Sequence, residues 1–175
     1  MGGRSRSRAR HGVTERSITI RRARESDLAQ VLEIERVSFV DPWNRDSFEM
    51  ALDVSRMLFL VAEGAEESGS GVEPKHPAVV GYVIAILLFD EAEVADLAVL
   101  PQVRGKGVGG TLIDEVGVQA GHLGVRTLYL EVRESNTSAR ALYESRSFTQ
   151  VGRRRGYYQH PHEDALLMRR DIDVD

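Results

Sequence analysis

The feature that most constrains this chain is a glycine-rich run, Arg104-Gly105-Lys106-Gly107-Val108-Gly109-Gly110. An apolar segment of the strand type, 93–99, precedes it, and apolar residues at helical spacing follow it over 108–123. Glycines let backbone N–H groups approach a ligand closely, and the N-terminus of a helix favours negative charge. Arg104 and Lys106 add two cations. The run therefore predicts a cradle for an anionic, phosphate-bearing ligand.

Two familiar phosphate loops fit this run poorly. A P-loop needs Ser or Thr after its lysine, and here Gly107 follows Lys106. The dinucleotide pattern GxGxxG is met by Gly105, Gly107 and Gly110, with Glu131 further along the chain. However, 100–104, which contains a proline, separates the strand from the first glycine. Dinucleotide binding therefore stays open only as a minor alternative.

A third pattern, Gln/Arg-x-x-Gly-x-Gly/Ala, is met at every fixed position by 104–109. The structural alternative is a glycine-rich turn that only joins a strand to a helix. Each surplus glycine in an ordered element costs roughly 0.5–1 kcal/mol, so packing alone is a weak explanation for four of them. We therefore favour a binding loop.

The composition is that of one ordinary globular domain. The chain has 175 residues and is 42% hydrophobic, which is long enough for one well-buried core. It contains no cysteine, which excludes disulfides, thiolate metal sites and a cysteine nucleophile. No apolar run approaches the ~18–20 residues of a membrane span. We expect a cytoplasmic monomer that binds neither membranes nor a specific nucleic acid.

The first sixteen residues differ from the rest in charge. They carry five arginines against Glu15, a local charge of +4, whereas the whole chain carries −4. We expect 1–16 to be a disordered Arg-rich tail, and a flexible leader is favoured over an RNA contact. The domain should span 17–171. Within it, the Gly/Ser/Glu/Pro stretch 64–77 should be a flexible hairpin insertion without an assigned role.

The hydrophobic pattern predicts a mixed α/β sheet in the order β-α-α-β-β-β-α-β-α-β-β. The expected strands are 17–23, 57–63, 78–89, 92–99, 126–132, 148–153 and 165–169. The expected helices begin near Leu28, Asn44, Val108 and Asn136. Asp41-Pro42 separates the first two helices, and Ser26-Asp27 offers capping side chains before the first.

The loop and four further blocks resemble the Gcn5-related N-acetyltransferase (GNAT) superfamily over roughly 17–170. These blocks are Phe39-Val40-Asp41-Pro42-Trp43, Leu130-Glu131-Val132-Arg133-Glu134-Ser135-Asn136, Ala141-Leu142-Tyr143-Glu144-Ser145 and Arg154-Arg155-Gly156-Tyr157-Tyr158. Within that superfamily they are most similar to bacterial enzymes that acetylate the N-terminal alanine of a ribosomal protein. The resemblance implies a single-domain fold with about seven strands and about four helices. It also implies acetyl-CoA as co-substrate, no metal, and a protein N-terminus as acceptor.

The resemblance assigns the two catalytic roles. Amide formation from a thioester needs a neutral amine and a proton for the leaving thiolate. An α-amino group has a pKa near ~8, against ~10.4 for lysine, so a weaker base is sufficient at a protein N-terminus. Glu131, which in an arbitrary strand would be a polar-face residue, is implied as general base. Tyr143, which would otherwise be a core aromatic, is implied as general acid.

The resemblance also implies the binding residues. The strand end at Leu97, Ala98 and Val99 would present backbone groups to the pantetheine arm and polarise the thioester carbonyl. The remaining predicted cofactor-binding residues are Arg104, Gly105, Lys106, Gly107, Val108, Gly109, Gly110 and Asn136. The predicted substrate-binding residues are Trp43, Tyr157 and Tyr158, the tyrosines in a loop over the acceptor site and on opposite sides of an extended chain.

Two further observations complete the prediction. His160, His162 and Glu163 invite a metal site, but a solvated turn is favoured because further ligands are lacking at suitable spacing. Ser147 stands where the family usually has glycine in a left-handed cap. Two other functions stay open, namely acetylation of a small amine and a non-catalytic acyl-CoA-binding module.

Overall fold

The computed structural model describes residues 18–64 and 78–172. The elements are β1 (Thr19–Arg22), α1 (Leu28–Ser38), α2 (Arg45–Asp53), β2 (Met57–Gly64), β3 (Ala78–Leu88), β4 (Glu91–Val99), α3 (Val108–His122), β5 (Thr127–Arg133), α4 (Thr137–Glu144), β6 (Thr149–Gln159) and β7 (His162–Asp171). The predicted tail, and the insertion beyond Gly64, lie outside the described residues. The described chain forms one α/β domain with a mixed seven-stranded sheet and four α-helices, as the sequence predicted.

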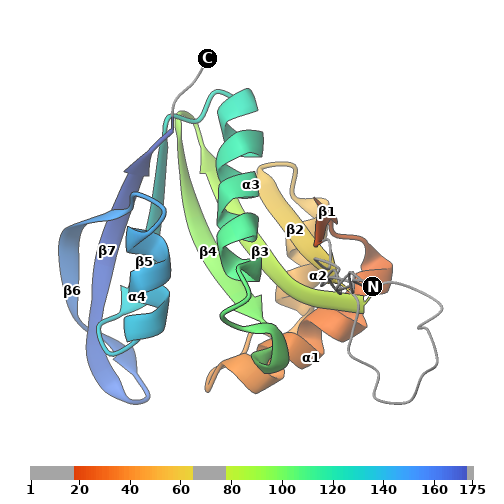
Figure 1. The fold of residues 1–175 in the computed structure, drawn as a ribbon, viewed down its shortest axis with the longest axis horizontal. Coiled ribbons are helices and arrows are strands. Elements are labelled where there is room, and N and C mark those ends of the chain that lie inside the picture. The colour runs from red at the N-terminus through yellow and green to blue at the C-terminus, as the bar shows by residue number, and fades with distance from the viewer. Residues whose placement is uncertain (1–17, 65–77, 173–175) are drawn as a thin grey trace, which may run out of the picture.

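Among the described strands, the sheet has a single parallel pair, and it is divided there. The strand order is β1-β2-β3-β4-β5-β7-β6, and all neighbours are antiparallel except β4 and β5. These two strands pair only over Glu91–Val94 and Thr127–Leu130. Beyond that point β5 continues on β7 as far as Arg133, and β4 continues on β3 as far as Val99. The strands therefore diverge, as Figure 1 shows between β4 and β5.

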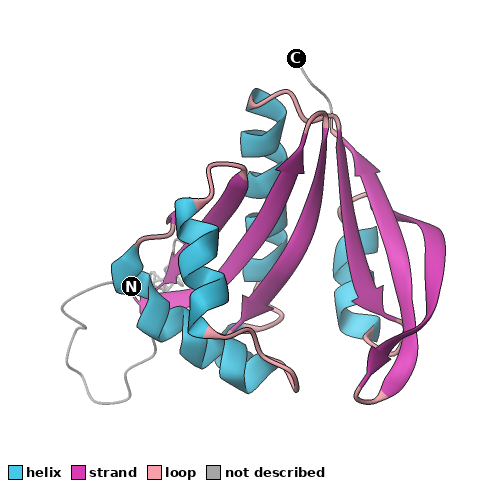
Figure 2. Ribbon diagram, turned by 180° about the vertical axis from the view of Figure 1, so that it is seen from behind, coloured by secondary structure: helices cyan, strands magenta, loops and turns pink. Residues whose placement is uncertain are grey.

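Helices cover both faces of the sheet. Helix α3 lies on one face, where Leu112, Val116 and Ala120 pack in an apolar core with Leu58 and Leu60. Helices α1 and α2 lie on the other face, which Figure 2 shows from behind. Their core contains Val31, Ile34 and Phe48 with Phe59 and Ile84. None of the helices in the described ranges is long and apolar enough to cross a membrane.

A β-bulge in β4 decides which face its last residues occupy. Ile84 of β3 pairs with Asp96, whereas Ala85 pairs with Val94, so Ala95 is an extra residue. Alternation along a strand reverses across such an insertion. Val94 accordingly joins the core under α3, and Ala98 joins the core under α1 and α2. The bulge therefore directs Asp96 toward α1.

The C-terminal hairpin corrects one part of the sequence prediction. Strands β6 and β7 extend well beyond 148–153 and 165–169, so Tyr157 and Tyr158 belong to β6 rather than to a loop. The pairing register shifts between Arg154 and Tyr158, with Gly156 at φ 58°. The two tyrosine rings meet edge to face at 5.1 Å. They are therefore in contact rather than on opposite sides.

Candidate active site

The glycine loop combines open backbone with left-handed geometry. Gly105 has φ 75° and Gly107, the N-cap of α3, has φ 86°. A Cβ atom at either position would meet nothing within 4 Å. Positive φ explains why glycine is needed, and open space means that the backbone can be approached from outside. The N–H groups in the first turn of α3 have no partner within the helix and suit an anion.

The other two glycines of the run have close neighbours. A Cβ on Gly109 would lie 3.2 Å from Leu142 Cδ2, which is a tight contact, and one on Gly110 would meet the Arg146 guanidinium, the flexible end of a side chain that can move away. The Arg104 guanidinium is already bonded within the fold, since it donates to Val99 O at 2.8 Å and Ser38 Oγ at 2.9 Å. The predicted role of its side chain toward a diphosphate stays a prediction.

The end of β4 presents one free edge to the divergence. Leu97 to Val99 pair with β3 on one side, through Val83, Tyr82 and Gly81, and pair with no residue of β5 on the other. Peptide groups on that edge can bind an extended ligand arm as an added strand would. This placement agrees with the predicted contact to pantetheine.

Glu131 lies on β5 just past the last residue that pairs with β4. Its side chain is 11% exposed and forms an ion pair with Arg154 at 2.8 Å from β6. The Tyr157 hydroxyl also bonds to Glu131, and this bond raises the tyrosine pKa. Arg154 in turn lies over the Tyr157 ring at 5.4 Å. Sequence reasoning named Glu131 and Tyr157 but missed the arginine, whose partner is set by the β6–β7 register.

Tyr143 lies on α4, 8% exposed, with its ring against Phe148 at 5.8 Å. Burial, reinforced by the charge of Asp96 and by Tyr158, raises the Tyr143 pKa to about 12. The hydroxyl therefore holds its proton at neutral pH, which is the form that a general acid needs. The raised pKa also makes it a weaker acid than an ordinary phenol, so it can assist a departing thiolate only while the C–S bond breaks.

Asn136 and Ser147 lie at the two ends of α4. The Asn136 side chain accepts from the Ala139 N–H at 3.1 Å and so caps the helix, while its predicted contact to coenzyme A stays a prediction. Ser147 has φ 64°, the left-handed conformation that glycine adopts more readily.

The predicted acceptor residues come from two separate walls. Trp43, between α1 and α2, packs on Phe48 at 5.7 Å. Tyr158 lies on β6 beneath the Arg133 guanidinium, 3.9 Å from the ring centre. His160 Nδ1 of the hairpin lies 3.7 Å from Asp41 Oδ2, so the hairpin and the α1–α2 connection approach each other there. The residues predicted to contact the acceptor thus lie on both walls.

The histidine cluster has the geometry of a turn. Glu163 is occupied by Arg133 at 2.9 Å and by the Ser135 N–H at 3.1 Å. Within 18–64 and 78–172, no three His, Cys, Asp or Glu side chains are grouped so as to hold a metal ion.

A buried polar cluster near the site was missed. The Tyr82 hydroxyl contacts Glu35 Oε2 and lies 2.9 Å from Asp96 Oδ2. Burial raises the Glu35 pKa; burial and the charge of Glu35 raise the Asp96 pKa to about 7. The sequence held part of the signal, because Glu35 follows Val31 at helical spacing on the apolar side of α1.

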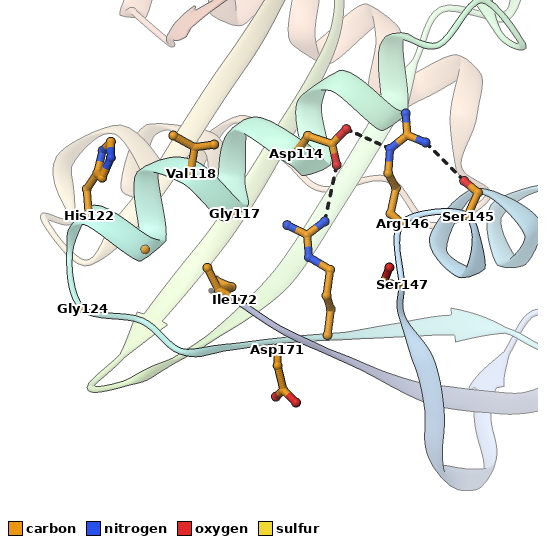
Figure 3. Close-up of a pocket in the computed structure, with 12 residues that line it drawn as sticks. Asp114, Gly117, Val118, His122, Gly124, Ser145, Arg146, Ser147, Asp171 and Ile172 are labelled. Carbon is orange, nitrogen blue, oxygen red and sulfur yellow. Dashed lines mark hydrogen bonds and ion pairs between the residues drawn. The ribbon is translucent and has the colours of Figure 1, made fainter. Parts of the chain in front are cut away.

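A separate hollow of about 980 Å³ lies at the far end of α3. Figure 3 shows Asp114 there with a dashed contact to Arg146. Asp114 lies 2.8 Å from the Arg146 guanidinium and 3.4 Å from that of Arg170. None of the predicted site residues lines this hollow. The glycine loop and the β4–β5 divergence therefore define the candidate site better than cavity size does.

The chain is similar to known acetyltransferases. The acetyltransferase (GNAT) family matches residues 28–148. The bS18-alanine N-acetyltransferase of Escherichia coli (strain K12) is 29% identical over 158 residues, which cover 89% of this chain and 99% of that protein. A Bacillus subtilis protein that carries the same name provisionally is 33% identical over 150 residues, which cover 85% of this chain and 92% of that protein.

Solved structures agree with these relatives. The crystal structure of the E. coli ribosomal-protein-S18-alanine N-acetyltransferase has a TM-score of 0.76 at 30% identity and covers 91% of this chain and 96% of that chain. Arabidopsis thaliana NAA60 with a bisubstrate analogue has a TM-score of 0.78 at 22% identity, covering 91% and 100%, which shows the fold alone. The chain therefore belongs to the GNAT family and is an acetyl-CoA-dependent N-acetyltransferase.

Proposed function

We propose that this enzyme acetylates the N-terminal α-amino group of a protein, namely the N-terminal alanine of ribosomal protein bS18, with Glu131 as general base and Tyr143 as general acid. One observation carries the proposal. Glu131 lies where β5 leaves β4, and Tyr143 of α4 lies close enough to Asp96 of β4 for that charge to raise its pKa. The name of the E. coli relative supplies the substrate. A ribosomal substrate also implies a cytoplasmic enzyme.

The residues would act in turn while a C–N bond replaces the C–S bond of the thioester. Acetyl-CoA supplies the thioester carbon that the amine attacks. Glu131 takes the proton from the α-ammonium, directly or through a water, so that the amine carries its lone pair. A backbone N–H at the end of β4 stabilises the negative charge that develops on the carbonyl oxygen. As the C–N bond forms and the C–S bond breaks, Tyr143 gives its proton to the departing thiolate. The second proton that the nitrogen loses on becoming an amide returns to the Tyr143 phenolate through solvent, which restores the acid.

Arg154 would regulate the availability of the base. Its ion pair fixes the position of the Glu131 carboxylate and occupies one of the oxygens that would accept the proton. The arginine side chain is 59% exposed, so it can swing into solvent when a peptide arrives. Tyr157, whose hydroxyl bonds the same carboxylate, would then stay as the fixed partner of Glu131.

The test is turnover with acetyl-CoA and short peptides. A peptide with the bS18 N-terminus should be acetylated on its α-amine, and the same peptide with a blocked N-terminus and an internal lysine should not. Product on the blocked peptide alone would overturn the N-terminal assignment. Rapid turnover of free small amines without peptide turnover would favour a small-molecule acetyltransferase, and tight acetyl-CoA binding without any turnover would favour a binding module.

A further inference from the structure

We infer that Glu35, Tyr82 and Asp96 form a proton-sharing triad that positions the acceptor wall at Trp43, so that peptide binding weakens when the shared proton is lost. The three residues are positioning residues, since none is placed against the reacting atoms. The inference rests on the proposed function for its kinetic part, and on geometry alone for its structural part.

The triad links three elements behind the site. Glu35 lies on α1, Tyr82 on β3 and Asp96 on β4. All three residues are buried, with 2%, 0% and 9% of their surface exposed. The Tyr82 hydroxyl stands between the two carboxyl groups. The Tyr82 ring is held by aromatic contacts to Phe48 at 5.5 Å and Phe59 at 6.2 Å. The hydroxyl position is therefore fixed independently of its hydrogen bonds.

Counting protons shows that the triad must hold an extra one. A phenol has a single proton and can donate to only one carboxylate. If Tyr82 donates to Glu35, its oxygen can bond the second carboxyl group only when Asp96 is protonated and donates to it. Within residues 18–64 and 78–172 neither carboxylate forms an ion pair with a cation, so two ionised carboxylates would repel each other in a medium of low polarity. Burial and Glu35 raise the Asp96 pKa to about 7, which is the direction this arrangement requires.

One arm of the triad reaches the acceptor wall. Glu35 Oε1 accepts the Trp43 backbone N–H at 2.7 Å, so the same carboxyl group bonds both Tyr82 and the connection between α1 and α2. The other arm reaches the reaction centre, because Asp96 precedes Leu97 and its charge raises the Tyr143 pKa. The titratable groups facing Asp96 are therefore Glu35 from α1, Tyr82 from β3 and Tyr143 from α4.

Loss of the shared proton should loosen this wall. With both carboxyl groups ionised, Tyr82 can bond only one of them. Repulsion between Glu35 and Asp96 should then displace Glu35 and, with it, the Trp43 segment whose N–H it accepts. Rising pH should therefore raise the KM for peptide while the KM for acetyl-CoA changes little. This effect opposes the usual gain from a deprotonated amine, so it should appear as a loss of peptide affinity above neutral pH.

The structural part is tested with Trp43, which is the only tryptophan of the chain. Its fluorescence should be recorded from pH 5.5 to 9 in the full-length protein. We expect one inflection near pH 7 in the wild type and none in Asp96→Asn. His160 contacts Asp41 close to Trp43, so the titration should be repeated in His160→Gln, where the inflection should persist. A flat curve in both, or an unchanged inflection in Asp96→Asn, would overturn the triad.

A matched control separates the triad from general loss of stability. Asp27 is another buried carboxylate on the same face, 5% exposed, but it pairs with Arg21 at 2.7 Å. Asp27→Asn should lower thermal stability and leave the fluorescence inflection in place. Loss of the inflection in this control would show that it reports unfolding rather than the triad.

The kinetic part uses Tyr82→Phe, which removes the hydroxyl and keeps the ring. We expect the KM for an alanine-starting peptide to rise roughly tenfold, as for a hydrogen bond to a charged group, with the KM for acetyl-CoA nearly unchanged. Equal changes in both constants, or no change in either, would overturn the positioning role. If the wild type acetylates no peptide but shows the Asp96-dependent inflection, the proposed substrate fails and the proton-sharing triad stands.

Discussion

The two faces of the sheet bury different chemistry. The core under α3 consists of apolar side chains with Tyr143 as its only phenol among the described residues. The core under α1 and α2 encloses Glu35 and Asp96 around the Tyr82 hydroxyl. Apolar burial does not respond to pH, whereas a shared proton does. The comparison teaches that the proposed coenzyme face can be rigid at every pH while the proposed acceptor face adjusts to it.

Two buried carboxylates on the acceptor face sharpen the contrast. Asp27 pairs with Arg21 and accepts the Arg24 N–H at 2.8 Å; although burial opposes the shift, these bonds lower its pKa. Asp96 has a phenol and a second acid as neighbours, and its pKa rises. Both carboxylates are buried, yet their pKa values shift in opposite directions. The pKa of Asp27 falls because a cation lies beside it, and the pKa of Asp96 rises because a second acid does.

The largest effect should come where the two faces meet. Tyr143→Phe should retain acetyl-CoA binding and lower turnover by about 10²–10⁴-fold, because the thiolate loses its proton donor. The loss should persist at high pH. Tyr129→Phe removes a phenol from the neighbouring strand β5 and should leave turnover intact. Near-normal turnover in Tyr143→Phe would remove the tyrosine from the mechanism.

Glu131→Gln should follow, with a loss of roughly 10²-fold at low pH, where more of the substrate is ammonium. Raising the pH past the amine pKa of ~8 should restore part of the rate, because solvent then removes the proton. The measurement is a pH–rate profile with one alanine-starting peptide. Glu134→Gln, which breaks an ion pair with Arg153, is the matched control. Parallel profiles for the Glu131 and Tyr143 variants would refute the separate roles.

Gly107→Val tests the coenzyme face alone. The side chain would stand in the open space of the loop at φ 86°, and we expect acetyl-CoA affinity to fall about tenfold or more. Gly124 at the other end of α3 has φ 87° and equally open surroundings. Gly124→Val should therefore cost a similar ~1–2 kcal/mol of stability without changing affinity. Calorimetry on both variants decides, and equal affinity losses would reject the cradle.

Asp96→Asn tests the acceptor face through stability. The Asp96 pKa is about 7 in the folded protein against an ordinary value of 3.8. Between these values the folded state keeps a proton that the unfolded state has lost, so stability falls as pH rises through this window. Relative to wild type, Asp96→Asn should gain about 2 kcal/mol on going from pH 5 to pH 8. Denaturant unfolding at the two pH values measures it, and a pH-independent difference would contradict the shift.

The smallest effect should come from Ser147→Gly, on the same side of the sheet as α3. Glycine relieves the left-handed conformation at φ 64° and should add roughly 1 kcal/mol of stability. The gain should be equal at pH 5 and pH 8, which contrasts with Asp96→Asn. A pH-dependent gain would mean that the two faces are electrostatically coupled more strongly than this comparison allows.

The sequence predicted the fold well because the central elements carry strong periodicity. Strands β2 to β5 and helix α3 lie within about two residues of the expected ranges. The prediction made the C-terminal hairpin too short because β6 is polar over Arg153-Arg154-Arg155. Cross-strand ion pairs support it, such as Arg153 with Asp164 at 2.9 Å, and a partner strand cannot be read from one segment.

The site was predictable to the extent that local blocks define it. Glu131, Tyr143 and the loop glycines stand in such blocks. In the structure Glu131 lies just past the last β4–β5 pair, and Tyr143 lies within the electrostatic reach of Asp96, while their catalytic roles stay predictions. Arg154 and Asp96 were missed for a different reason. Their roles depend on pairing register and on the bulge at Ala95, which are relations between strands.

The bulge at Ala95 reverses the alternation of side chains between the two faces of β4. If β4 ran through Ala95 as a regular strand, Asp96 would follow Val94 into the apolar core under α3, where a carboxyl group would find no Tyr82. The triad therefore depends on the bulged geometry of β4 as well as on its three side chains. Deletion of Ala95 should preserve the triad, because Ile84 would still pair with Asp96 and Ala85 with Val94.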